Sequence, residues 1–223
     1  MNQTHFIADL HLCEDTPKLN MLFLKYLADW VGRLDALYIL GDLFDAWVGD
    51  DDHHHATEEI IAALRAFAQQ TPVFVQHGNR DFLLGAEFAR RAGVTLLDEV
   101  HSLHVYDRSF VLVHGDSLCT DDTVYQQFRS QSRHPAWQAA ILAKPLAERR
   151  LLAAQIRQVS EQGKAEYGQA DILRLGALGR LDPRRQDPDG AALARAQRLH
   201  PPLAEPGASG GRRAAHPRGG QPV

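Results

Sequence analysis

Short apolar runs alternate along the first half of the chain with segments whose apolar residues recur every three or four positions. The runs have the length of buried strands, and the spaced segments are typical of amphipathic helices. The predicted strands are 6–8, 37–40, 73–75, 94–97 and 110–113, and the predicted helices are 19–30, 60–68 and 88–93. Strands that alternate with helices predict an α/β fold, with layered β-sheets flanked by helices.

Polar clusters stand directly after four of the predicted strands. In α/β folds, ligands bind beyond the carboxyl ends of the strands, so these clusters are expected to meet in space. They are Asp9-Leu10-His11, Gly41-Asp42, Gly78-Asn79-Arg80-Asp81 and His114-Gly115-Asp116.

The residue types in these clusters favour a divalent metal site. On an extended segment, Asp9 and His11 would point the same way and reach one ion. Asp42 adds a carboxylate that could bridge two ions, Asn79 adds a carbonyl oxygen, and His114 adds a second imidazole. Oxygen and nitrogen ligands of this kind suit Mn, Fe or Zn. We therefore predict metal binding by these five residues.

Arg80 extends this prediction to chemistry on a phosphate. A guanidinium group binds phosphate oxygens in a fixed planar geometry. Two ions roughly 3.5–4 Å apart would neutralise an anionic phosphate and supply a nucleophile near neutral pH. The predicted reaction is hydrolysis of a phosphate ester or pyrophosphate bond. The predicted catalytic residues are Asp9, His11, Asp42, Asn79, Arg80 and His114.

Composition narrows the setting of this chemistry. The 223 residues are 44% hydrophobic, enough for one main domain. The net charge of -4 is not the excess of positive charge that is typical of nucleic-acid-binding proteins. Two distant cysteines make no disulfide framework, which favours a reducing cytoplasm. The first residues do not read as a signal peptide, and no apolar run is long enough to span a membrane.

The remaining features are a helical region, an acidic run and three single aspartates. Residues 136–160 have a helical pattern divided by Pro145, and this region is expected to be either a lid over the site or a helix pair packed on the core. The acidic and His-rich run 50–55 is interpreted as a solvated loop rather than a metal site. Asp81 and Asp116 are expected to orient the His ligands, and Asp121 is expected to be a turn or cap residue.

The order of the four clusters resembles the calcineurin-like metallophosphoesterases. Their wider surroundings resemble the UDP-2,3-diacylglucosamine hydrolase family within that group, over about residues 4–171. The segments that carry this resemblance are 6–12, 37–44, 77–85 and 114–122, which read FIADLHL, LYILGDLF, HGNRDFLLG and HGDSLCTDD.

The resemblance implies a reaction and a location. The implied reaction is hydrolysis of the pyrophosphate bond of UDP-2,3-diacylglucosamine to UMP and 2,3-diacylglucosamine 1-phosphate, a step of lipid A biosynthesis. Two Mn²⁺ ions would be the cofactors. A monomer attached peripherally to the cytoplasmic face of the inner membrane is expected, with no nucleic-acid partner.

The resemblance also implies residue roles within a metallophosphoesterase domain over residues 1–171. Asp9, His11, Asp42, Asn79 and His114 would bind the metal. A helical lid over residues 123–167 would shield the acyl chains. The residues expected to contact substrate are Asn79, Arg80, Asp122, Ser160, Lys164 and Tyr167.

Residues 172–223 depart from the family pattern. They contain no aromatic residue and no Lys, but nine Arg and seven of the 11 Pro, which predicts a disordered tail. The family's Gly-His-x-His motif is absent, and neither His200 nor His216 replaces it. We interpret this as a reading-frame change near residues 168–175. It predicts a domain without its closing strands and with weak or no activity.

Two alternatives to the leading assignment remain open. One is another nucleotide pyrophosphatase or phosphodiesterase of the same superfamily. The other is a catalytically dead protein that still binds the substrate, which the missing His pair favours.

Overall fold

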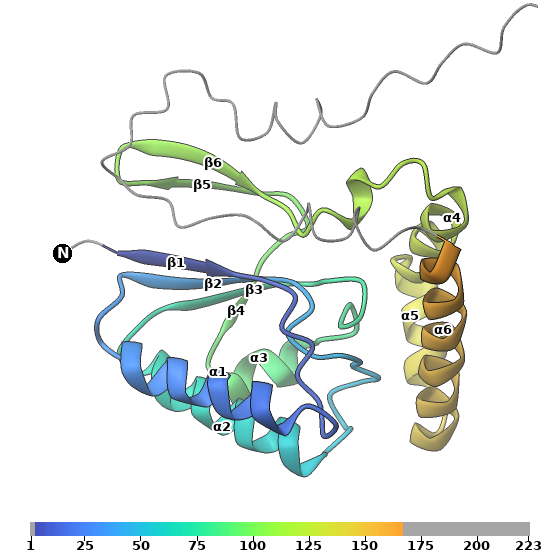
Figure 1. Cartoon of the computed structure of the whole chain (residues 1–223), viewed down its shortest axis with the longest axis horizontal. Helices are drawn as coiled ribbons and strands as arrows, with labels where there is room; N and C mark the ends of the chain where they lie inside the picture. The colour runs from blue at the N-terminus through green and yellow to red at the C-terminus, as the bar shows by residue number, and fades with distance from the viewer. Residues whose placement is uncertain (1–2, 167–223) are drawn as a thin grey trace, which may run out of the picture. The chain divides into compact units, whose positions relative to one another are not determined.

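The computed structural model describes residues 3–166 (Figure 1). Four parallel strands form the main sheet in the order β1-β2-β3-β4. Ile7 lies opposite Ile39, and Leu40 lies opposite Gln76, so the first three strands end near one edge of the sheet. These four predicted strands are confirmed, with their ends shifted by one or two residues. Their bounds are β1 Thr4–Ile7, β2 Ala36–Leu40, β3 Val73–Gln76 and β4 Thr95–Leu96.

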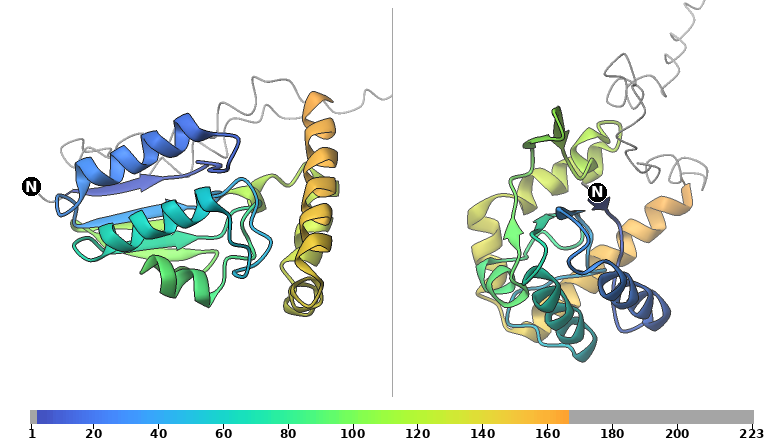
Figure 2. Two further views of the ribbon diagram at one scale, coloured as in Figure 1. Left: turned by 90° about the horizontal axis from the view of Figure 1, so that it is seen from below. Right: turned by 90° about the vertical axis from the view of Figure 1, so that its left-hand side faces the viewer.

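Three helices cover one face of this sheet (Figure 2). They are α1 Pro17–Trp30, α2 His55–Ala68 and α3 Ala86–Ala92, and they confirm the three predicted helices. The apolar stripe of each helix packs on the sheet, where Leu37 and Ile39 are fully buried. Gly93 ends α3 with a φ of 70°, the left-handed cap that glycine adopts without a Cβ penalty.

An antiparallel hairpin, β5 His101–Val105 and β6 Arg108–Leu112, forms a second sheet. Its Leu112 shares a small core with Tyr38 and Leu40, which project from the opposite face of the main sheet. The layered sheets predicted from the sequence are therefore present. Strand β6 was predicted, whereas β5 was missed because His101, Ser102 and His104 interrupt any apolar run.

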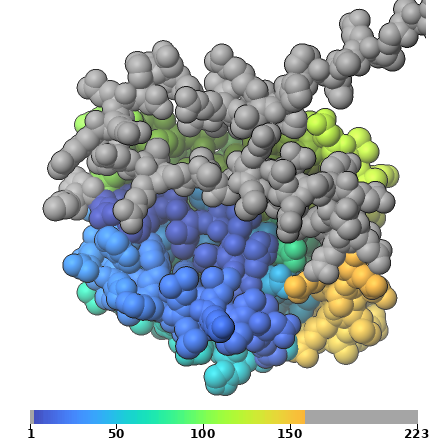
Figure 3. Space-filling view, viewed as in Figure 1, coloured from blue at the N-terminus to red at the C-terminus, as the bar shows by residue number. Residues whose placement is uncertain are grey.

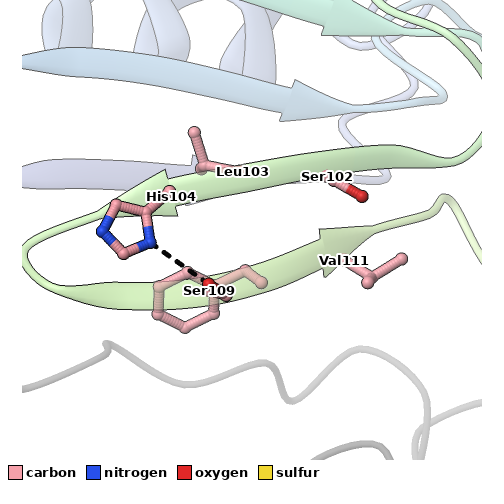
Figure 4. Close-up of a pocket in the computed structure, with 6 residues that line it drawn as sticks. Ser102, Leu103, His104, Ser109 and Val111 are labelled. Atoms are coloured by element: carbon pink, nitrogen blue, oxygen red, sulfur yellow. Dashed lines mark hydrogen bonds between the residues drawn. The ribbon is translucent and has the colours of Figure 1, made fainter.

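The hairpin also carries a hollow lined by Ser102, Leu103, His104, Ser109, Phe110 and Val111 (Figure 4). A 3.1 Å hydrogen bond joins His104 Nδ1 and Ser109 Oγ there. None of the predicted metal ligands lines this hollow.

The remaining helices follow the second sheet. They are the short η1 Asp116–Leu118, α4 Thr123–Ser132, α5 Pro135–Leu142 and α6 Leu146–Glu166. Figure 1 shows α5 and α6 beyond the carboxyl ends of β1 and β2. Pro145 divides these two helices, as predicted. Ile141 is buried in the main core, with Trp137 and Leu152 packed against it. The helix pair therefore packs on the core, and its role as a lid stays a prediction.

The run 50–55 is more than a solvated loop. Asp50 accepts hydrogen bonds from the backbone of Gly85 at 3.0 Å and of Phe88 at 2.9 Å, so it fixes the start of α3. Asp51 pairs with Arg149 and Asp52 pairs with Arg150, both on α6. The run is exposed or partly exposed, as expected for a solvated loop, and its aspartates also dock two helices.

The tail and its consequences lie outside the described residues. These are the predicted disorder of 172–223, the missing closing strands and the domain limit at residue 171. In the part of the chain that the structure describes, no helix combines the length and the apolar character needed to cross a bilayer.

Candidate active site

The loops that follow β1, β2 and β6 bring three predicted ligands together. Asp9, Asp42 and His114 each offer one ligand atom, and these atoms lie within 4.8 Å of one another. Asp42 is almost fully buried, whereas Asp9 is exposed. Such a spacing lets one cation contact all three side chains. The predicted convergence of the strand-end clusters is confirmed.

The two carboxylate oxygens of Asp42 face different imidazoles. Its Oδ2 lies 3.7 Å from His11 Nε2, and its Oδ1 lies 3.8 Å from His114 Nε2. The backbone amide of Arg80 donates a 2.9 Å hydrogen bond to Oδ1. Asp42 thus stands between the two His rings, where a bridging carboxylate would be placed.

His114 is held with its Nε2 directed at this cluster. Its Nδ1 lies 2.8 Å from the carbonyl oxygen of Leu40, which can only accept, so Nδ1 carries the proton. The Nε2 lone pair then faces Asn79 Oδ1 at 3.1 Å. The Nε2 lone pair and the Oδ1 oxygen are both hydrogen-bond acceptors and repel each other, and a cation bound to both would remove that repulsion. Metal-binding His residues commonly use their second nitrogen in this way.

Burial raises the pKa of Asp42 to about 7. That pKa also includes the raising effect of the Asp81 and Asp9 carboxylates and the lowering effect of His114 and the Arg80 amide. Ionised carboxylates so poorly solvated are costly unless a positive charge offsets them. The oxygen and nitrogen donors present suit a hard or borderline divalent ion. The residues of this site therefore fit a divalent metal.

Residues 4–154 match the family of calcineurin-like phosphoesterases. The chain belongs to that family.

Relatives of this phosphoesterase carry a more specific name. A UDP-2,3-diacylglucosamine hydrolase of Chromobacterium violaceum is 56% identical over 168 residues, which are 75% of this chain and 71% of the relative. That of Xanthomonas axonopodis pv. citri is 46% identical over 181 residues, 81% of this chain and 73% of the relative. That of Stenotrophomonas maltophilia is 44% identical over 185 residues, 82% and 75%. The phosphoesterase groups with these proteins.

The backbone of the phosphoesterase is unusual at three candidate ligands. Asp9, His11 and Asp42 have positive φ angles of 56°, 48° and 53°. The prediction that Asp9 and His11 lie on an extended segment is wrong. Each left-handed residue costs roughly 1–3 kcal/mol and persists only where its surroundings enforce it. Backbone hydrogen bonds from Asp9 to Gly41 at 3.2 Å and from His11 to Asp42 at 3.0 Å supply that constraint.

Two glycines leave room for the ligands. A Cβ at Gly78 would lie 2.0 Å from Asp42 Oδ1, and one at Gly41 would lie 2.5 Å from His114 Nδ1. Gly41 also has a φ of 89°, which side chains with a Cβ rarely adopt. Glycine is required at both positions for the Asp42 and His114 side chains to stand where they do.

Asp81 positions backbone rather than imidazole. Its carboxylate is fully buried and accepts hydrogen bonds from the amides of Gly78 at 2.7 Å, Leu43 at 2.8 Å and Asp42 at 3.3 Å. Burial raises the pKa of this carboxyl. Asp81 therefore joins the loops after β2 and β3. The prediction that it orients a His ligand is wrong, because its partners are main-chain amides.

Asp116 likewise contacts groups other than the candidate His ligands. Its Oδ2 accepts from Tyr125 Oη at 2.6 Å and from Arg129 Nε at 2.9 Å. Although burial opposes the shift, these partners and the Arg133 charge leave the pKa of Asp116 below its ordinary value. Arg133 also donates to the carbonyl oxygen of Gly78 at 2.9 Å. Asp116 thus links α4 to the loop that carries Asn79.

The predicted substrate contacts are distributed unevenly. Arg80 directs its guanidinium to Asp45 Oδ1, 3.0 Å away, beside the cluster. Asp121 lies in the turn before α4, which confirms its prediction as a turn or cap residue, and Asp122 caps α4 by accepting from the Tyr125 amide at 2.9 Å. Ser160 and Lys164 belong to α6, but their side chains are outside the described part of the phosphoesterase, as is all of Tyr167.

Proposed function

We propose that the chain hydrolyses the pyrophosphate bond of UDP-2,3-diacylglucosamine, giving UMP and 2,3-diacylglucosamine 1-phosphate for lipid A biosynthesis. The observation that carries this function is the meeting of Asp9, Asp42 and His114 within 4.8 Å. The 56% identity to a UDP-2,3-diacylglucosamine hydrolase supports the substrate.

The proposed cofactors are two Mn²⁺ ions held by Asp9, His11, Asp42, Asn79 and His114. Bound divalent ions polarise phosphoryl oxygens and lower the pKa of water, which makes a nucleophile available near neutral pH. Support for a pair comes from Asp42, whose two oxygens face His11 and His114 separately.

The chain's own residues orient the phosphate. Arg80 is fixed at both ends, by its amide on Asp42 and by its guanidinium on Asp45. The guanidinium nitrogens that do not contact Asp45 would bind phosphate oxygens, and charge-assisted bonds of this kind are among the strongest that proteins make. Arg80 would hold the pyrophosphate in line for attack and stabilise charge on the oxygens of the transition state.

Helices α4 to α6 are proposed to form the lid. Trp137 lies with its ring centre 6.1 Å from that of Phe82 and 6.2 Å from that of Phe128. This aromatic cluster joins the lid to the loop that follows β3 and offers an apolar surface for acyl chains. Asp122, Ser160, Lys164 and Tyr167 are the proposed polar contacts.

A monomer attached peripherally to the cytoplasmic face of the inner membrane remains the proposed state. A diacylated substrate resides in a membrane, which supports this location. The absent Gly-His-x-His motif supports a second candidate, a protein that binds the substrate without turning it over. With five candidate ligands for two ions, we propose that turnover is low.

The test is release of UMP from UDP-2,3-diacylglucosamine by the full chain, with and without Mn²⁺, with Asp42→Ala as the control. Mn-dependent UMP release that the substitution abolishes supports the proposed hydrolase. Simple nucleotides and p-nitrophenyl phosphate esters serve as competing substrates, and preference for one of them identifies a different phosphodiesterase. Tight substrate binding without UMP release identifies the non-catalytic protein. Elemental analysis of the purified chain counts the bound metal.

A further inference from the structure

Asp45 joins the candidate phosphate-binding residue to a lid helix. Its side chain is only 8% exposed. One oxygen, Oδ1, accepts from Arg80 Nη1 at 3.0 Å, and the other, Oδ2, pairs with Arg157 Nη1 on α6. Arg157 lies 112 residues along the chain from Asp45. A single buried carboxylate therefore contacts both guanidinium groups.

The carboxylate itself is held in place. The Asp45 amide donates to the carbonyl oxygen of Leu12 at 3.2 Å, which ties it to the segment that follows Asp9 and His11. Its Oδ1 lies 3.8 Å from His11 Nδ1. Asp45 is thus fixed relative to the metal cluster, so a group that binds Asp45 is also positioned relative to that cluster.

The other anchors of α6 lie nearer its start. Arg149, buried to 4% exposure, donates to the carbonyl oxygen of Val48 and to Asp51 Oδ1, both at 2.7 Å. Arg150 pairs with Asp52. Arg157 stands about two turns further along the helix. Figure 3 shows α6, in gold, meeting the amino-terminal half of the chain at the surface.

The charge of Asp45 matters because two positively charged groups, those of Arg80 and Arg157, bind the same carboxylate. Two guanidinium groups that face one site repel each other, and the Asp45 carboxylate offsets that repulsion. Without it, Arg80 loses the partner that directs its guanidinium, and Arg157 loses its link to the loop after β2.

We infer that Asp45 is a positioning residue that couples the seating of α6 to the orientation of Arg80. The inference deepens the proposed function and rests on it for the reaction itself. Asp45 does not touch the reacting atoms. It places one cationic group for the phosphate and, through the other, holds α6 against the loop that carries that group.

Steady-state kinetics on UDP-2,3-diacylglucosamine with Mn²⁺ test the coupling. Asp45→Asn should lower kcat/KM by roughly 10- to 100-fold, the usual loss for a partner of a site residue, with kcat reduced and KM raised. Arg157→Gln should raise KM and leave kcat within about twofold, because Asp45 still directs Arg80. The KM of the double variant should be no higher than that of Asp45→Asn alone, since both changes break the same contact between Asp45 and Arg157. Asp45→Glu, which restores the charge, should recover part of kcat.

Arg150→Gln is the matched control, because it removes an ion pair of the same helix that does not pass through Asp45. It should leave kcat and KM unchanged. If Asp45→Asn behaves like Arg150→Gln, or if the KM effects of Asp45→Asn and Arg157→Gln add, the coupling is refuted.

Hydrogen exchange gives a readout that needs no turnover. Backbone amides at 153–158 should exchange faster in both Asp45→Asn and Arg157→Gln, with those at 147–150 unchanged. Unaltered exchange at 153–158 overturns the inference whatever the activity. If the unsubstituted chain releases no UMP while exchange in the variants changes as expected, the proposed function is refuted, but the role of Asp45 in holding α6 is supported.

Discussion

The backbone amide of Arg80 donates a 2.9 Å hydrogen bond to Asp42 Oδ1, across 38 residues of sequence. This contact joins the ends of β2 and β3 at the candidate metal cluster. One carboxylate thereby orients the phosphate-binding loop while its oxygens face two imidazoles. Changes at Asp42 should therefore affect metal binding and the loop together.

Asp42→Asn should lower kcat/KM for UDP-2,3-diacylglucosamine by more than the roughly 100-fold typical of a residue that only supports a ligand. The reason is that an amide carries no charge to bind a second ion. Bound Mn per chain, measured by elemental analysis, should fall in parallel. Retention of both metal and turnover would remove Asp42 from the site.

Metal-free protein should lose stability as pH rises from about 4 to about 7. The pKa of Asp42 is raised by burial to about 7, so in this window the folded state binds more protons than the unfolded state. The contribution is complete below the ordinary pKa of Asp and lost as pH passes the raised one. It is on the order of 2–4 kcal/mol.

The measurement is thermal unfolding in chelator at pH 5 and pH 8. Asp42→Asn cannot ionise, so its melting temperature should fall less over this range than that of the unsubstituted chain. Added Mn²⁺ should stabilise the unsubstituted chain at pH 8 and not the variant. Equal pH dependence in both proteins would contradict the assignment.

Gly78→Ala should displace Asp42, because the added Cβ would lie 2.0 Å from its Oδ1. Overpacking of this kind costs about 1–3 kcal/mol. The free energy of unfolding in urea and the Mn affinity should both fall.

Gly115→Ala provides the control. Within residues 3–166, and its two chain neighbours aside, no atom lies within 4 Å of a Cβ there, so its φ of 103° is what resists the change. It should cost about 1 kcal/mol and leave Mn affinity close to normal. If both variants bind Mn alike, the space at Gly78 does not serve the ligand.

Asp81→Asn should destabilise the protein by about 1–3 kcal/mol, because one of its buried amide partners loses its acceptor. Gly78 and Leu43 donate to opposite oxygens of this carboxylate, and an amide group can accept at only one of them. Urea unfolding measures the loss, and Mn affinity should weaken as the two loops separate. A variant as stable as the unsubstituted chain would show that the junction is dispensable.

Much of the fold could be predicted from the sequence because buried strands and helices have a characteristic spacing of apolar residues. The apolar run 37–40 marks a strand covered on both faces, and the spacing of Leu19, Phe23 and Leu27 marks the buried face of α1. The candidate ligands could be predicted for a related reason. Parallel strands bring their carboxyl ends to one edge, so polar residues that follow them must meet.

The positioning network could not be predicted in this way. Asp45 resembles any acidic loop residue until folding places Arg80 and Arg157 on either side of it. Asp81 could be recognised as a motif residue, but not as the acceptor for the amides that follow β2. Strand β5 left no apolar run, and it forms because β6 pairs with it and a second face of the main sheet needs cover.

The sequence by itself determined which side chains follow the strands and what chemistry they offer. Only the tertiary structure decided the left-handed turns at Asp9, His11 and Asp42, and the carboxylates that hold the loops together. The physical reason is range. Hydrophobic periodicity acts over a few neighbouring residues, whereas a hydrogen bond such as that of Arg80 to Asp42 exists only once distant segments have packed.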